Sequence, residues 1–291
     1  MYPHPALHSF MQGCNSKISG RILNRTMDEA MFKVTDCRNA DVGISRLSTK
    51  QPQCYAPHVD VTRARCGYRA FALSKLRNEL HVDDPLIVRR AVTTIADILV
   101  NPEKLSEALK LRIPDRLSDL LVSQDSYLRE RVAMAFITIG GRSAGREAIL
   151  KNASTLCNLS KGLGDRLAAV RIKMALAVEM LSRAACAAED LCSYGFIELI
   201  VNRLTFERKA ILLVLLDILK SLLDRKLKSH AMEIDIVEKL TILLRRKDQE
   251  TLAGALSCLA ILCQESALKQ VVIDKDLFPR LKDMLDDQVD S

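Results

Sequence analysis

The chain has 291 residues, of which 48% are apolar and 27% charged, and its formal net charge is +7. Aromatic residues make up only 4% and tryptophan is absent, which argues against nucleic-acid binding through a basic stripe with stacking aromatics. No apolar stretch reaches the roughly 18 residues that a membrane-spanning helix needs. The length alone would allow two domains.

Residues 1–59 differ in kind from the rest of the chain. They hold four of the eight prolines, and no apolar run among them keeps a helical or strand period. We expect a disordered or loosely attached extension in which Ile18–Val34 forms at most a weak helix. The extension lacks the sustained apolar core of a signal peptide. Asp28 and Glu29 interrupt the basic face that an organelle-targeting helix over Lys17–Lys33 would need.

Ordered structure is expected to begin near Asp60. Gly67–Leu80 is predicted to be the first helix of medium length. Asp84 followed by Pro85 favours the start of a long helix, because Asp can cap free backbone amides and proline fits the first helical position. Pro114 is expected to start the next medium helix in the same way.

The stretch Ser126–Gly141 shows the long helix most clearly. Its apolar residues lie at helical spacing, Asp125 or Ser126 can cap its start, and Gly140–Gly141 ends it. Similar helices are predicted at Leu86–Val100, Ala168–Arg183, Lys209–Leu223 and Glu250–Cys263.

Two independent markers recur with one period. The first apolar anchors of the long helices are spaced by 40, 42, 41 and 41 residues; they are Val88, Leu128, Val170, Ile211 and Leu252. The last leucines of the preceding medium helices are spaced by 41, 42, 41, 40 and 41; they are Leu80, Leu121, Leu163, Leu204, Leu244 and Leu285. A third, short helical segment is predicted at Glu103–Leu109, Ser143–Leu150, Ala185–Cys192 and Ser266–Ile273, and less clearly near Lys226–Met232.

A three-helix unit with a period near 41 residues favours armadillo over HEAT repeats. The predicted fold is therefore an all-α, right-handed superhelical solenoid of about five and a half repeats. The units are expected at 60–110, 111–152, 153–193, 194–233 and 234–275, with a partial unit at 276–287 and a tail at 288–291. The partial unit would leave an apolar edge, which either another protein or the acidic end of the chain would cover.

The sequence offers no candidate active site, cofactor site or metal site. The nine cysteines form no C-x-x-C pair and no Cys/His pattern at zinc spacing, and the five histidines are scattered. Cys258 and Cys263 are expected in the core. An odd cysteine count without a signal peptide indicates a reducing compartment. Gly140, Gly141 and Gly145 are better explained by a helix–helix turn than by a phosphate loop, because no strand precedes them.

The expected function is binding through a concave groove lined by the long helices. Two inward positions, six and ten residues after each anchor, form the predicted ladder: Thr94 and Ile98, Met134 and Thr138, Leu176 and Met180, Asp217 and Ser221, Cys258 and Leu262. Nuclear-import adaptors of this fold carry Trp and Asn ladders that clamp basic peptides, and this ladder has neither. Its apolar character suits a helix or an apolar segment of a fixed protein partner. The alternative is that several of these residues are buried between helices.

Arg89, Arg129 and Arg171 each follow an anchor by one place. They form a basic row for an acidic partner, or alternatively are solvated arginines in the first turn of each helix.

Three segments carry a resemblance to a known family: Asp60–Leu80 (DVTRARCGYRAFALSKLRNEL), Ser143–Leu150 (SAGREAIL) and Ser193–Leu204 (SYGFIELIVNRL). All three resemble the radial spoke protein 14 family. The resemblance covers about residues 60 to 287, with a longer N-terminal extension and a C-terminus that stops about one or more repeats early.

The resemblance implies an armadillo-repeat subunit of the radial spokes in the axoneme of motile cilia and flagella. Such a subunit contacts other spoke proteins and helps to transmit mechanical control to the dynein motors. The alternative is a soluble cytoplasmic armadillo adaptor in signalling or transport. Either protein would have protein partners, with no nucleic acid, membrane or small-molecule substrate.

Overall fold

The computed structural model describes residues 62–64, 71–184, 186–223, 235–246 and 248–274. The chain divides into two compact units, residues 1–72 and 73–291. Nearly all the described residues belong to the second unit, which is the subject below. The predicted extension 1–59, the segment near Lys226–Met232 and the partial repeat 276–287 lie outside the described residues.

The described residues form helices and no strand. The long helices are α5 (Pro85–Ile98), α8 (Ser126–Gly140), α11 (Ala168–Ser182), α14 (Lys209–Leu223) and α16 (Gln249–Leu262). The medium helices are α4 (Ala72–Glu79), α7 (Ile113–Leu120), α10 (Ala153–Leu163), α13 (Phe196–Arg203) and α15 (Ile236–Leu243). The predicted short segments are the connecting helices α6 (Pro102–Lys110), α9 (Ser143–Leu150), α12 (Ala187–Ser193) and α17 (Ser266–Asp274). The predicted all-helical repeat fold is thus confirmed.

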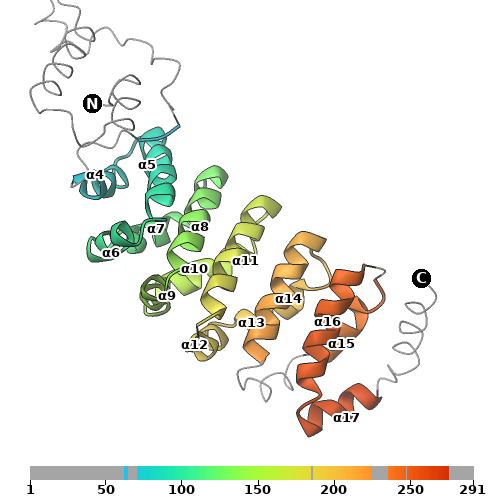
Figure 1. Cartoon of the computed structure of the whole chain (residues 1–291). Coiled ribbons are helices and arrows are strands. Elements are labelled where there is room, and N and C mark those ends of the chain that lie inside the picture. Colours follow the sequence, from blue (N-terminus) through green and yellow to red (C-terminus); the bar gives the residue numbers. More distant parts are fainter. Residues whose placement is uncertain (1–61, 65–70, 185, 224–234, 247, 275–291) are drawn as a thin grey trace, which may run out of the picture. The chain divides into compact units, whose positions relative to one another are not determined.

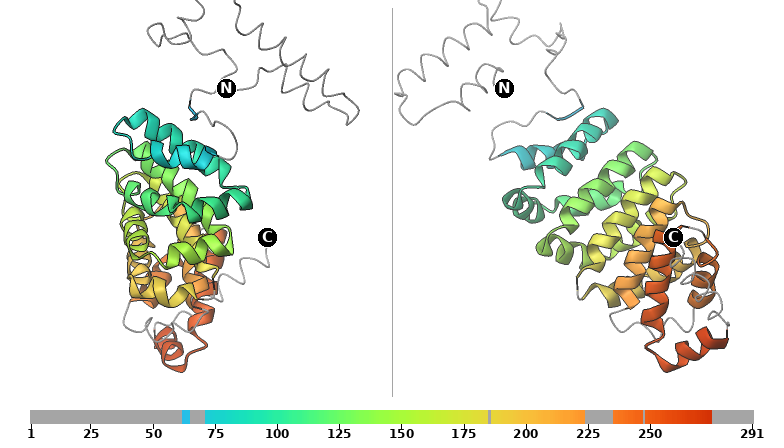
Figure 2. Two further views of the ribbon diagram at one scale, coloured as in Figure 1. Left: turned by 90° about the vertical axis from the view of Figure 1, so that its left-hand side faces the viewer. Right: turned by 45° about the vertical axis from the view of Figure 1, so that its right-hand side comes forward.

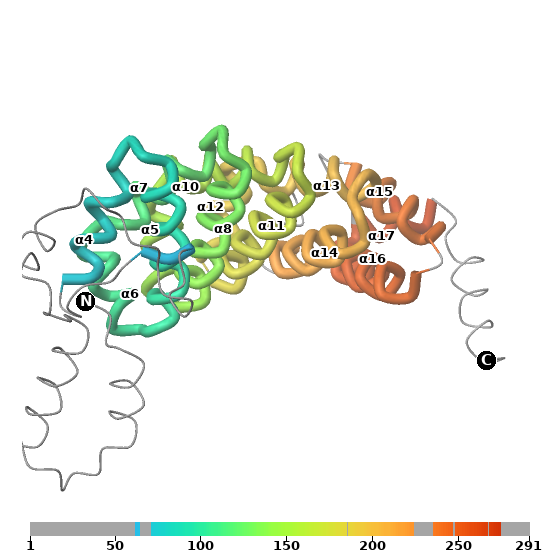
Figure 3. Tube along the Cα trace, turned by 90° about the horizontal axis from the view of Figure 1, so that it is seen from above, coloured from blue at the N-terminus to red at the C-terminus, as the bar shows by residue number. Residues whose placement is uncertain are grey.

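The helices stack as two layers. Each long helix packs against the long helix of the next repeat, so that α5, α8, α11, α14 and α16 lie side by side (Figure 1, Figure 2). The medium helices α7, α10, α13 and α15 form the second layer, and each packs against the long helix that follows it (Figure 3). Every repeat therefore completes its core with residues of its neighbours.

The two sequence markers lie in this shared core. The medium-helix leucines from Leu80 to Leu244 are at most 2% exposed, and the anchors Val88, Leu128, Val170 and Ile211 are at most 7% exposed. Burial of a leucine or valine side chain contributes roughly 1.5–3 kcal/mol, so this periodic burial is a main source of stability. Leu285 lies outside the described residues.

The fifth anchor was predicted one residue too late. Leu252 is partly exposed, whereas Thr251 is fully buried and its hydroxyl donates to Asp248 Oδ2 at 2.6 Å. This hydrogen bond satisfies the threonine hydroxyl, so the side chain is buried without an unpaired polar group. With Thr251 as the anchor, the spacing from the medium-helix leucine to the anchor in the fifth repeat is 7 residues, as in the second, third and fourth repeats.

The shifted register corrects two predicted groove positions. Cys258 is fully buried, as the core interpretation expected, and Leu262 is fully buried too. Their place on the outer side of α16 is taken by Ser257 and Ile261, which are both partly exposed.

Two predicted helix starts, those of α5 and α7, can be compared with the structure. Asp84 accepts a hydrogen bond from the backbone amide of Leu86 at 2.9 Å, with Pro85 at the first position of α5, as predicted. Pro114 occupies the second position of α7 rather than the first, because that helix begins at Ile113.

Gly145 allows a tight corner between α8 and α9. A Cβ at this position would lie 2.0 Å from the carbonyl oxygen of Ile139, which no side chain can tolerate. The next residue, Arg146, donates from Nη1 to the carbonyl of Gly140 at 2.9 Å and so closes the end of α8. The predicted helix–helix turn is confirmed.

None of the described helices combines the length and apolarity needed to cross a membrane.

Candidate functional site on the long-helix layer

The candidate site is the outer side of the long helices α5, α8, α11 and α14, called here the long-helix face. Its partly exposed members from the predicted ladder are Ile98, Met134, Thr138, Leu176, Met180 and Ser221, and Asp217 is exposed. Thr94 differs, since it is only 5% exposed and its hydroxyl donates to the carbonyl of Arg90 at 2.8 Å. The structure therefore places most of the ladder at the surface, and its part in binding stays a prediction.

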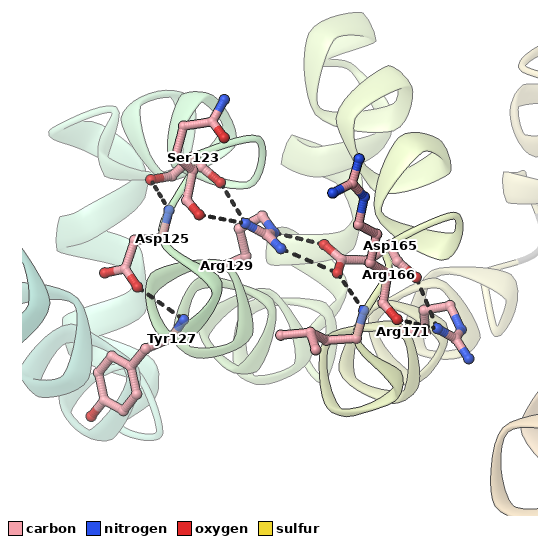
Figure 4. Close-up of polar contacts among 9 residues, drawn as sticks. Ser123, Asp125, Tyr127, Arg129, Asp165, Arg166 and Arg171 are labelled. Carbon is pink, nitrogen blue, oxygen red and sulfur yellow. Dashed lines mark hydrogen bonds and ion pairs between the residues drawn. The ribbon is translucent and has the colours of Figure 1, made fainter.

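Each of the three predicted arginines reaches across to the next repeat. Arg89 bonds Asp125, Arg129 bonds Asp165 and Arg171 bonds Glu207, always 36 residues further along the chain. The acidic residue precedes the next long helix, and Asp125 also caps that helix by accepting from the amide of Tyr127 at 3.1 Å. We call these three pairs the inter-repeat ties; Figure 4 shows the second of them, Arg129–Asp165.

The second and third ties share one geometry. Arg129 binds Asp165 through Nε at 2.6 Å and Nη2 at 3.1 Å, and its Nη1 donates to the carbonyls of Ser123 and Gln124. Arg171 binds Glu207 through Nε at 2.7 Å and Nη2 at 3.0 Å. Its Nη1 likewise donates to carbonyls six and five residues earlier, those of Asp165 and Arg166 (Figure 4). A planar guanidinium suits such two-point binding, which a lysine cannot provide.

The ties are also progressively buried along the chain. Side-chain exposures are 42% and 22% for Arg89–Asp125, 17% and 8% for Arg129–Asp165, and 16% and 3% for Arg171–Glu207. The buried Glu207 accepts a second ion pair from Arg203 at 2.7 Å. The arginine donors are therefore engaged within the chain, which makes a direct contact with an acidic partner less favourable for them.

The carboxylates of the ties are held in their charged form. Burial alone would raise the pKa of Asp165, but the hydrogen bonds from Arg129 and the amide of Leu167 lower it below its usual value. Burial likewise opposes the hydrogen bonds from Arg171 and Arg203 at Glu207, and the pKa of that carboxyl is again lowered. The same balance lowers the pKa of Asp125 beside Arg89.

A fourth connection joins α14 to α16 with a lysine. Lys209 Nζ lies 2.5 Å from Asp248 Oδ1 and 2.6 Å from Glu250 Oε2. The hydrogen bonds from Lys209 and then Thr251 lower the pKa of Asp248 to about 2. This pair could not be predicted from the arginine pattern, because Lys209 lies two residues before the anchor Ile211 rather than one residue after it.

The long-helix face also carries three basic side chains that the ladder omitted. Arg90, Arg131 and Lys173 follow their anchors by two or three residues and are partly exposed. On a helix, positions three and six share one side, so Arg131 borders Met134 and Lys173 borders Leu176, while Arg90 lies four residues before Thr94. Helical spacing counted from the anchor was the signal that would have identified them.

Two open clefts lie away from this face. One of about 870 Å³ is lined by medium and connecting helices, and one of about 660 Å³ is lined by α13 and Phe206. In the larger cleft the His81 ring bonds the carbonyl of Arg77, and the Ser154 hydroxyl bonds Asn152. These hydrogen bonds do not join the two side chains to each other. Within the described part of the chain, no group of His, Cys, Asp and Glu is placed to hold a metal ion.

No protein-family model matches the chain. Similar solved structures include an engineered protein with 20% identity and a TM-score of 0.65, covering 73% of this chain and 90% of the other. Computationally designed armadillo repeat proteins for modular peptide recognition reach 16% identity and a TM-score of 0.67, over 72% of this chain and 91% of the other.

A third solved structure is a designed armadillo repeat protein in complex with the peptide (KR)4. It is 16% identical with a TM-score of 0.66, over 72% of this chain and 90% of the other. Likeness at this level of identity shows the fold, which is that of an armadillo-repeat solenoid.

Proposed function

We propose that this chain is a non-enzymatic scaffold that binds another protein along the long-helix face. The observation that carries the proposal is the row of partly exposed apolar side chains on successive helices, from Ile98 through Met134 to Leu176 and Met180. Contiguous apolar surface on a soluble protein is typical of an interaction site. The designed neighbour that holds a (KR)4 peptide supports the use of this fold for peptide binding.

The inter-repeat ties support the same role. A partner that spans several repeats is bound best by a surface whose repeats keep a fixed spacing, because less ordering is then needed on binding. Buried two-point ion pairs such as Arg129–Asp165 and Arg171–Glu207 fix one repeat against the next. The repeated ties thus favour a preorganised docking surface.

We further propose that the partner complex is the radial spoke of the ciliary axoneme. This proposal rests on the resemblance of Asp60–Leu80, Ser143–Leu150 and Ser193–Leu204 to the radial spoke protein 14 family. The second segment forms α9, where Gly145 and Arg146 have a structural role at the corner with α8. A cytoplasmic armadillo adaptor in signalling or transport is the second candidate.

Fractionation of motile cilia tests the assignment to the axoneme. The tagged full chain, expressed in a ciliated cell, is expected to stay with the insoluble axoneme after detergent extraction. In cilia that lack radial spokes it should be lost from that fraction. Release of the chain by detergent from spoke-containing cilia would instead support the adaptor.

Charge substitutions on the face test the binding site within the same assay. Met134→Glu with Leu176→Glu is expected to abolish retention, because two carboxylates would interrupt the apolar row. Val122→Glu with Ile242→Glu is the matched control, since these side chains are 46% and 40% exposed and lie outside the long helices. Both double variants should keep the wild-type melting temperature. Equal retention of both would contradict binding through the long-helix face.

A further inference from the structure

Three cations on the α5, α8 and α11 part of the long-helix face have no carboxylate partner among the described residues. They are Arg90 on α5, Arg131 on α8 and Lys173 on α11, three helices that pack against one another in order. The arginines of the ties, by contrast, each bind an acid of the next repeat. The unmatched positive charge of this face therefore comes from the three cations and not from the arginine row.

The surroundings of Arg131 show how its charge is held in place. The guanidinium lies 5.2 Å from the centre of the Tyr127 ring, with Arg89 at 5.6 Å from the same ring. Its Nη1 contacts the sulfur of Met134 at 3.5 Å, and its buried Nε has no hydrogen-bond partner. A ring face and a thioether compensate a guanidinium weakly compared with a carboxylate. Arg131 is thus preorganised next to a ladder residue without an acidic group to bind.

The charged side chains of the long-helix face differ at α14. There the ladder position carries Asp217, which is exposed, in place of Met134 and Leu176 on the preceding helices. The helix also has Leu213 at the place equivalent to Arg90, and Val214 at the place equivalent to Arg131 and Lys173. An acidic ligand therefore finds cations at these positions over α5, α8 and α11, whereas α14 offers none at the equivalent positions.

We propose that the face of α5, α8 and α11 binds an extended acidic and apolar segment of a partner protein. Carboxylates of the segment lie beside Arg90, Arg131 and Lys173, and its apolar side chains lie on Met134 and Leu176. The inference rests on the proposed scaffold function and names the chemistry of the partner. It also separates this chain from the designed neighbour with the (KR)4 peptide, whose ligand has the opposite charge.

The spacing of the helices sets the spacing of the carboxylates. Packed helices lie about 8–10 Å apart, and an extended peptide advances about 3.3 Å per residue. A peptide that crosses the three helices therefore meets one cation about every third residue. An acidic residue at every third position is the expected pattern, and acids clustered at one end would match it poorly.

The experiment measures fluorescence anisotropy of labelled peptides with the full-length chain. The probe has about twelve residues, a Glu-Leu-Ser repeat that places an acid at every third position. One control peptide has Lys for Glu, and another has the same composition with its acids clustered at one end. The expected order of affinity is the Glu-Leu-Ser repeat first, then the clustered peptide, with the Lys peptide weakest.

Matched protein variants assign the binding to the three cations. Arg90→Ala, Arg131→Ala and Lys173→Ala together are expected to weaken the Glu-Leu-Ser repeat by about tenfold or more. The control removes the same charge from exposed cations of other helices and loops, with Lys110→Ala, Lys161→Ala and Arg245→Ala, and should change affinity less than about twofold. Equal losses in both triple variants, or tighter binding of the Lys peptide, would overturn the inference.

Two further comparisons identify the bound segment and distinguish a failure of this inference from a failure of the proposed function. A peptide of residues 283–291, which is acidic and contains Leu285, is compared with the Glu-Leu-Ser repeat. If it binds more tightly and the chain self-associates in light scattering, the occupant is a second copy and the partner segment proposed above is wrong. If the chain stays with axonemes but ignores acidic peptides, only the present inference fails. If it binds them through the three cations but washes out of axonemes, only the radial spoke assignment fails.

Discussion

The joint between α11 and α14 and the joint between α14 and α16 each contain an ion pair, but the two ion pairs differ in residue type and in burial. In the first, Arg171 binds Glu207 at two points, and both side chains are largely buried at 16% and 3% exposure. In the second, Lys209 bonds Asp248 and Glu250 with exposures of 51%, 31% and 65%. Each pair links the start of one long helix to the start of the next, but only the first is shielded from water. Removing one partner of a buried ion pair costs more free energy of unfolding than removing one partner of an exposed pair. Equivalent substitutions should therefore destabilise the first joint more than the second.

The largest effect is expected from Arg171→Leu. It leaves the buried Glu207 with Arg203 as its remaining ionic partner and removes two hydrogen bonds to backbone carbonyls. Loss of one member of a buried pair costs about 3 kcal/mol, and urea unfolding followed by circular dichroism measures it. Arg208→Leu, at an exposed position close to the same joint, is the control and should be nearly neutral.

Arg129→Leu should cost somewhat less, about 2 kcal/mol. Asp165 would keep the amide of Leu167 as a donor, at 2.9 Å, and would still feel the charge of Arg171. The same urea experiment ranks the two variants. If Arg129→Leu proved more harmful than Arg171→Leu, burial would not be the factor that sets the strength of the ties.

Acid should weaken the buried joints selectively. The pKa of Asp165 and that of Glu207 are lowered in the folded chain, so their contribution is full above the unfolded-state values of about 4 and is lost as the pH falls through the lowered values. The stability difference between wild type and Asp165→Asn should therefore shrink as the pH falls below about 5 and through the lowered pKa of Asp165. Asp119→Asn, which affects an exposed ion pair of 3.5 Å, serves as the reference. A difference that stays constant with pH would contradict this account of the tie.

The smallest effect is expected from Lys209→Met. The lysine is half exposed, and water can replace its bonds to Asp248 and Glu250. The melting temperature should shift by less than about 2 °C, and high salt should reduce the wild-type advantage further. A shift as large as that of Arg171→Leu would show that the two joints are equivalent after all.

Much of the fold was readable from the sequence, and the reasons are local. Leu121 and Leu163 recur at one period because each closes the same packing site in successive repeats, and both are buried. Asp84 and Pro85 marked the start of α5 because capping depends on neighbouring residues alone. The register of α16 was misread, since an apolar Leu252 was preferred to a threonine whose hydroxyl Asp248 satisfies.

Most of the candidate site, by contrast, could not be predicted from the sequence. The recurrence of Arg89, Arg129 and Arg171 one residue after each anchor was visible in the sequence, but their acidic partners were not, because each lies 36 residues away. The exposure of Met134 and the burial of Thr94 also depend on neighbouring helices, not on helical spacing.

The sequence by itself determined the helical period, the three-helix unit and the residues of the shared core, because these follow from apolar spacing along a single helix. Only the tertiary structure decided which charges are matched. Stacking brings the start of each long helix against the start of the next, and this contact neutralises one row of arginines while leaving Arg90, Arg131 and Lys173 without an acidic partner among the described residues.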